Sequence, residues 1–160
     1  LRLSEQISES GNQVWHGVLE SSPVFSEKRG RREILDDPMN SVTLVREGDL
    51  LTGNLRVDGL LFKLRPLKNG NHVLIEVNEN LAPADHHADY ADPPMGMAAN
   101  SVTQAPSTKA NTVIRVMVHA TTAAINASGS ISSLIDLAVS ESNQSYSNSG
   151  VSITLQLAGK

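Results

Sequence analysis

The chain has 160 residues, of which 17 are acidic and 13 basic, and its net charge of −4 argues against a general role on nucleic acids or membrane surfaces. Because the sequence has no cysteine, it excludes disulfides, thiolate zinc sites and cysteine nucleophiles together. No stretch of consecutive apolar residues approaches the roughly 18 that a membrane-spanning helix needs. A membrane-spanning segment is therefore not expected, and neither is a membrane as a partner.

The first forty residues carry weak signals. Residues 1–10 are polar and weakly amphipathic, which predicts a frayed helix or coil, and residues 13–20 have strand-like content around Trp15. The basic cluster at residues 28–32 suits a phosphate-binding patch or a protease processing site, or else a solvated loop balanced by the acids beside it. The loop is favoured, because no aromatic residues interleave with the arginines as nucleic-acid binding requires.

Four strand candidates follow, at residues 41–46, 50–57, 60–65 and 72–78. They are separated by turn sequences such as Asp58-Gly59, one of the strongest local signals for a hairpin. With the strand around Trp15 they predict an antiparallel β-meander of about five strands. The expected core-facing residues are Val42, Leu44, Leu55, Val57, Leu61, Leu64, Val73, Ile75 and Val77.

Residues 81–111 have the composition of a linker, with several prolines and no periodicity. This segment holds the densest set of potential metal ligands in the chain. They are Asp85, His86, His87, Asp89 and Asp92.

Residues 111–159 read as one strand, helix and strand unit. A near-continuous apolar run at residues 113–118 predicts a strand covered on both faces, and Ser130 can cap an amphipathic helix over residues 130–146. Residues 151–157 alternate between apolar and polar, which is typical of a half-buried strand. Two strands joined by a crossover helix are expected to be parallel. Because such a unit is incomplete alone, the edge of the second strand is expected to receive further chain or a partner.

The predicted fold class is therefore α+β, with an antiparallel β-meander followed by an incomplete α/β start. The expected organisation is a β-rich module at residues 1–80, a linker at residues 81–111 and a βαβ part at residues 112–160.

Residues 41–80, with Arg65-Pro66-Leu67 after a glycine hairpin, resemble the propeptide of secreted bacterial zinc metalloendopeptidases of the reprolysin-like and peptidyl-Asp types, in the metzincin clan. Residues 112–159 resemble the first strand, helix and strand of their catalytic domain, with the likeness at residues 134–138 and 143–151. The two stretches cover about half of the chain. The resemblance implies a propeptide acting as chaperone and inhibitor, joined to the N-terminal scaffold of a secreted or periplasmic enzyme that uses zinc to hydrolyse peptides.

The sequence departs from that family at the catalytic motif. The family binds zinc through His-Glu-x-x-His, in which histidines four apart share one face of a helix. None of the chain's histidines, which are His16, His72, His86, His87 and His119, are four residues apart. The chain is therefore expected to be inactive alone, with no catalytic or cofactor-binding residue of its own. The remainder of the catalytic domain is its expected partner, and His119 is expected to be a partly buried structural histidine.

Two alternatives stay open for the sequence. The potential ligands at residues 85–92 are either an exposed, protease-sensitive linker, which is favoured, or a source of one side chain that occludes the zinc of the zymogen. For the whole chain, the alternative to a propeptide is a non-catalytic module whose sheet edge binds a protease or another protein.

Overall fold

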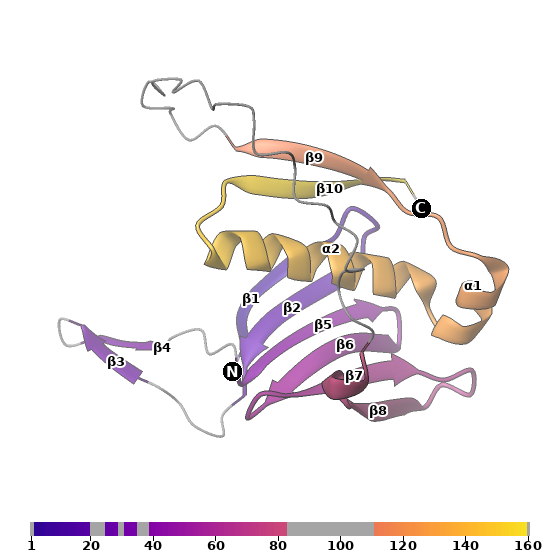
Figure 1. Ribbon diagram of the computed structural model, residues 1–160, viewed down its shortest axis with the longest axis horizontal. Coiled ribbons are helices and arrows are strands. Elements are labelled where there is room, and N and C mark those ends of the chain that lie inside the picture. The colour runs from indigo at the N-terminus through magenta and orange to yellow at the C-terminus, as the bar shows by residue number, and fades with distance from the viewer. Residues whose placement is uncertain (1, 20–24, 29–30, 35–38, 83–110, 160) are drawn as a thin grey trace, which may run out of the picture.

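The computed structural model describes residues 2–19, 25–28, 31–34, 39–82 and 111–159 (Figure 1). Its largest element is a six-stranded antiparallel sheet in the order β1-β2-β5-β6-β7-β8. The strands are β1 (Arg2–Ile7), β2 (Gln13–Val18), β5 (Ser41–Glu47), β6 (Leu50–Val57), β7 (Leu60–Pro66) and β8 (His72–Val77), and a short 3₁₀ helix, η1 (Glu79–Leu81), follows β8.

The predicted meander is confirmed in β5 to β8. The β6–β7 hairpin pairs Val57 with Leu60 across a two-residue turn in which Asp58 and Gly59 both have positive φ, of 49° and 85°. This is the backbone that an Asp-Gly turn favours, because its twist matches that of the flanking strands.

Two expectations for the first forty residues are wrong. Residues 2–7 form a strand rather than a helix or coil, because β1 pairs with β2 through the register Gln6 with Val14. The basic region is not a plain loop, since β3 (Phe25–Lys28) and β4 (Arg31–Ile34) pair as an antiparallel hairpin.

The strand, helix and strand unit is confirmed, but the expectation that its first strand is covered on both faces is wrong, because most of that strand is exposed. Strands β9 (Thr112–Met117) and β10 (Ile153–Gly159) are parallel, and helix α2 (Ile131–Asn148) joins them after the N-cap Ser130, whose side chain accepts a hydrogen bond from the Ser133 N–H. A shorter helix, α1 (Thr122–Ser128), was not predicted. No helix in the described part of the chain is long and apolar enough to cross a membrane.

Helix α2 lies between the two sheets (Figure 1). On one side it crosses the six-stranded sheet over β5 and β6, and on the other it packs against β10. The Asn143 side chain accepts from the Leu155 N–H at 2.7 Å and donates to the Leu155 carbonyl at 3.0 Å, so part of the outer edge of β10, expected to await a partner, is taken by the helix itself. The β-rich module and the βαβ part therefore meet along α2.

The predicted core set does not lie on one face of the sheet. By the strand registers, the face that α2 covers carries Leu61, Val73, Ile75 and Val77, and the opposite face carries Val42, Leu44, Leu55, Val57 and Leu64. Val14, Val45 and Thr52 are cross-strand neighbours on the covered face and are fully buried. The row on the opposite face runs from Trp15 through Leu44 to Leu74, which is 56% exposed. Of the predicted core set, Ile75 is 45% exposed, and Val42, Leu44 and Leu55 are only half-buried. The predicted aliphatic residues of β5 and β6 lie on the face away from α2, whereas the covered face of β6 carries Asn54, a polar partner of the helix.

Candidate functional site: the interface between helix α2 and the sheet

One stripe of helix α2 faces the sheet, and most of its buried members are polar. Ser133, Asp136 and Ser140 recur at three- and four-residue spacing, so they share one side of the helix. Leu137, which is 2% exposed, lies among them and forms the buried apolar cluster with Val14 and Val45. Since each polar side chain of the stripe meets a partner on the sheet, the interface is a set of hydrogen bonds around one leucine.

Asp136 is the centre of this interface. The residue is 4% exposed, and its carboxylate accepts hydrogen bonds from Ser8 Oγ at 2.9 Å, Ser10 Oγ at 2.8 Å and Asn12 Nδ2 at 2.7 Å. All three donors lie in or beside the turn between β1 and β2, where Gly11 has a φ of +83° that other residues rarely adopt. Hydrogen bonds to a carboxylate are stronger than neutral ones, so the β1–β2 turn holds the helix at its middle.

The N-terminus of α2 is held by an acidic residue of the sheet. Glu47, at the end of β5, accepts hydrogen bonds through Oε2 from the Oγ atoms of Ser130 and Ser133, the latter at 2.8 Å. Negative charge near a helix N-terminus is favourable because the first backbone N–H groups are unpaired and the helix dipole is positive there. The sheet therefore completes the cap that Ser130 begins.

Ser140 connects the helix to β1 and β2. Its Oγ accepts a hydrogen bond from Gln6 Nε2 at 2.9 Å and lies 2.8 Å from Nε2 of His16. The other ring nitrogen of His16 lies 3.1 Å from Thr43 Oγ1, so the buried imidazole bridges a helix hydroxyl and a strand hydroxyl. His16 is thus a structural residue of the interface.

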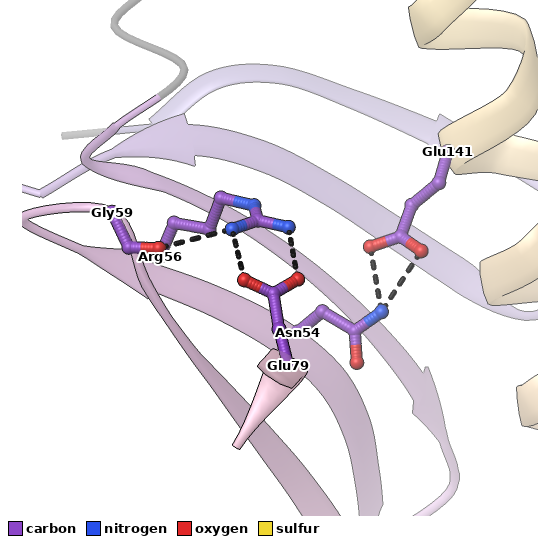
Figure 2. Close-up of polar contacts among 5 residues, drawn as sticks. All are labelled: Asn54, Arg56, Gly59, Glu79 and Glu141. Carbon is purple, nitrogen blue, oxygen red and sulfur yellow. Dashed lines mark hydrogen bonds and ion pairs between the residues drawn. The ribbon is translucent and has the colours of Figure 1, made fainter. Parts of the chain in front are cut away.

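Glu141 makes the contact nearest the C-terminal end of the interface. Asn54 Nδ2, on β6, donates to both carboxylate oxygens of Glu141 at 2.9 Å (Figure 2). Arg65 on β7 orients that amide by donating to Asn54 Oδ1 at 3.1 Å. Burial raises the pKa of Glu141, a shift that the Asn54 hydrogen bond and the nearby Arg65, Arg56 and Lys63 oppose. Burial also lowers the pKa of Arg65.

A more exposed ion pair lies beside this contact and involves the same strand, β6. Arg56 donates to both oxygens of Glu79, at 3.0 and 3.2 Å, and to the Gly59 carbonyl at 3.0 Å (Figure 2). The hydrogen bond to Arg56 lowers the pKa of Glu79 and raises that of Arg56. The pair links η1 to β6 of the sheet.

The predicted metal ligands lie in an undescribed part of the chain. Asp85, His86, His87, Asp89 and Asp92 all fall within residues 83–110, so their arrangement stays a prediction. Among the residues that the structure describes, no three His, Cys, Asp or Glu side chains gather as a metal site requires. The described donor set therefore does not fit zinc, and no chemical step is assigned to it.

The other histidines have structural surroundings. The His72 ring accepts a hydrogen bond from the Leu51 N–H at 2.8 Å. His119 is exposed, with Nε2 3.1 Å from Met117 Sδ, so the expectation that it is partly buried is wrong.

The α2 stripe itself was missed by the sequence reasoning. The one signal for it was Asp136, an acidic residue flanked by Ile135 and Leu137 within the apolar part of the helix. A carboxylate in that position needs hydrogen-bond donors when it is buried. Its donors are more than 120 residues away in the chain, so the sequence alone did not identify them.

The amino-acid sequence of the chain is similar to those of bacterial metalloendopeptidases. No family model matches the chain, and no solved structure matches it. Peptidyl-Asp metalloendopeptidases from Stenotrophomonas maltophilia strains K279a and R551-3 are each 49% identical to it over 154 residues, which are 93% of this chain and 36% of each relative. A peptidyl-Asp metalloendopeptidase from Xanthomonas campestris pv. campestris is 44% identical over 154 residues, 94% of this chain and 36% of the relative. The chain is thus similar over nearly its whole length to about a third of these bacterial metalloendopeptidases.

Proposed function

We propose that the chain is the propeptide and the first βαβ part of the catalytic domain of a secreted or periplasmic zinc metalloendopeptidase of the metzincin clan. The β-rich module of residues 1–80 acts as intramolecular chaperone and inhibitor, and residues 112–160 are scaffold. The zinc ligands and the general base belong to the remainder of the catalytic domain, which is also the chain's main partner.

The observation that carries the proposal is the position of α2. The sheet contacts one face of this helix over residues 130–141, from Glu47 at the N-terminus to Asn54 beside Glu141. Strands β9 and β10 alone cannot bury that helix, because two strands with one helix leave too much surface uncovered. A module that covers α2 until the rest of the domain has folded would act as a chaperone.

The segment between the two parts is where we place activation. A cut within residues 83–110 would free the scaffold from the module, whether the segment is a plain linker or also occludes zinc. For the second case Asp85, His86, His87, Asp89 and Asp92 are the candidates. Alanine at His86 or His87 in the precursor then gives activity before cleavage, whereas a plain linker leaves the uncut precursor as inactive as before.

The proposal is tested with the parent precursor. Its reading frame is expected to encode a His-Glu-x-x-His helix after the present residues, and the purified precursor is expected to contain one zinc per chain. Deleting residues 2–77 from the precursor gives protein that fails to refold to active enzyme, and adding the intact 160-residue chain during refolding restores part of the yield. A reading frame without that helix contradicts the protease assignment, and full refolding of the deletion variant contradicts the chaperone role.

A second function is favoured by one feature of the sheet. Within the described residues β8 pairs with β7 only, and Leu74 and Ile75 on this edge strand are exposed. A free strand edge with apolar side chains can receive an extended segment of another protein by adding a strand. On this alternative the chain is a non-catalytic binding or protease-inhibitor module, and it inhibits a target protease without any effect on refolding.

A further inference from the structure

Residues 83–110 separate the β-rich part of the chain, within residues 2–82, from residues 111–159, which contain α2. Each contact between the α2 stripe and the sheet described above joins one of these parts to the other. On the helix the polar contributors are Ser133, Asp136, Ser140 and Glu141. Their partners all come from the sheet and the β1–β2 turn, at residues 6–54. We propose that this stripe and the sheet form a separable docking interface, so that a cut within residues 83–110 leaves residues 2–82 bound noncovalently to residues 111–159.

The composition of the interface supports separability. Domain cores and obligate interfaces are mainly apolar, whereas interfaces between parts that also exist alone carry more polar contacts. Here the only large apolar side chain of the stripe with almost complete burial against the sheet is Leu137. After separation α2 would expose to water two serines, two carboxylates and one leucine, which is an ordinary helix surface.

The same contacts argue for strong binding while the parts are together. Asp136 accepts three hydrogen bonds, and the amide of Asn12 that donates one of them is itself buried. Glu47 and Glu141 add carboxylate contacts toward the two ends of the helix. Because the partners are arranged along the helix from residue 130 to residue 141, they fix its register and direction on the sheet as well as its affinity.

Asp136 is the residue that most determines the specificity of this docking. Replacing it by asparagine keeps the shape but turns one acceptor into an NH₂ donor. Hydroxyls such as those of Ser8 and Ser10 can rotate to accept instead, but the Asn12 amide nitrogen that faces Oδ2 can only donate. Asp136→Asn can therefore keep its contacts only with its oxygen toward Asn12 and its NH₂ toward Ser10, whose hydroxyl must turn to accept. What the change removes is the negative charge, so hydrogen bonds to a carboxylate are replaced by neutral ones, which are about half as strong.

The experiment uses the whole chain with a recognition sequence for a site-specific protease placed within residues 90–105. The chain is cut, and the products are separated by size-exclusion chromatography at micromolar concentration, with native mass spectrometry of the peaks. The two pieces are expected to elute together as a one-to-one complex, and Asp136→Asn is expected to raise the dissociation constant at least tenfold. The matched control is Asp49→Asn, the same change at a side chain that is 105% exposed, which leaves the complex unchanged.

Circular dichroism of each uncut variant shows whether the fold is retained. If uncut Asp136→Asn is unfolded, Ser140→Ala takes its place, since it deletes only the hydroxyl that meets His16 and Gln6. Separation of the wild-type pieces on the column overturns the inference, as does equal affinity of the folded interface variant and Asp49→Asn. Neither result depends on whether the parent protein is a protease, so the inference and the proposed function fail separately.

Discussion

Deleting the Leu137 side chain to alanine is the sharpest test of how the sheet holds α2. Leu137 is 2% exposed and packs with Val14 and Val45, on two different strands. The change removes three buried carbons at about 0.8 kcal/mol each and leaves a cavity, so the free energy of unfolding should fall by about 3 kcal/mol. Alanine is as good a helix former as leucine, so the loss comes from packing and not from the helix itself.

The assay for Leu137→Ala is urea unfolding, followed both by the fluorescence of Trp15 in the sheet and by far-ultraviolet circular dichroism. Both signals should move to lower urea together, because the deleted side chain joins the sheet to the helix. The control is Leu81→Ala, the same deletion at a side chain that is 81% exposed, which should change the unfolding free energy by less than about 0.5 kcal/mol. A loss no larger than that of the control, or a shift in the helix signal alone, would refute the reasoning.

Three further predictions concern polar groups of the sheet and helix. Burial raises the pKa of Glu141 above its ordinary 4.5, so its contribution to stability is present below pH 4.5 and is lost as the pH rises through the raised pKa. Glu141→Gln should therefore gain stability relative to the wild type as the pH rises toward neutral. A difference in unfolding free energy between the two proteins that stays constant with pH contradicts this. Thr52→Val should raise the unfolding free energy in urea by about 1 kcal/mol, because the Thr52 hydroxyl is buried without a hydrogen-bond partner among the described residues, whereas a loss would mean that the hydroxyl is satisfied. Glu79→Gln should leave the midpoint of thermal or urea unfolding nearly unchanged, since both partners of the Arg56 pair are substantially exposed, and a clear fall in the midpoint would show a tighter role for η1.

Local signals predicted the elements whose cause is local. Asp58-Gly59 marked the β6–β7 hairpin because only a few residues accept positive φ, and Ser130 marked the start of α2 because its hydroxyl caps the first turn. Strand β1 was missed because its sequence has little apolar alternation. It forms a strand because it pairs with β2, and its Gln6 side chain donates a hydrogen bond to Ser140 of α2.

The candidate site could not be predicted from the sequence, for a physical reason. The hydrogen bonds of Asp136 and Ser140 join positions more than 120 residues apart, and nothing in the neighbourhood of either residue specifies its partner. The packing of α2 on the sheet also explains why part of the core was predicted wrongly. Leu44 was expected to face inward for its apolar side chain, yet α2 lies over the face that carries Thr43 and Val45. The predicted zinc-occluding candidates at residues 85–92 stay untested for a different reason, since they fall outside the described residues.

The most direct test of the account is hydrogen exchange of the α2 amides in the intact 160-residue chain. If the sheet holds the helix, amides in the middle of α2, around Asp136 and Leu137, should be protected to the same free energy as those of the paired strands β5 and β6, because they open only when the whole unit unfolds. Cutting within residues 83–110 and removing residues 2–82 should then abolish that protection. Rapid exchange of α2 in the intact chain, or full protection of α2 without the sheet, would contradict the claim that the β-rich module supports α2.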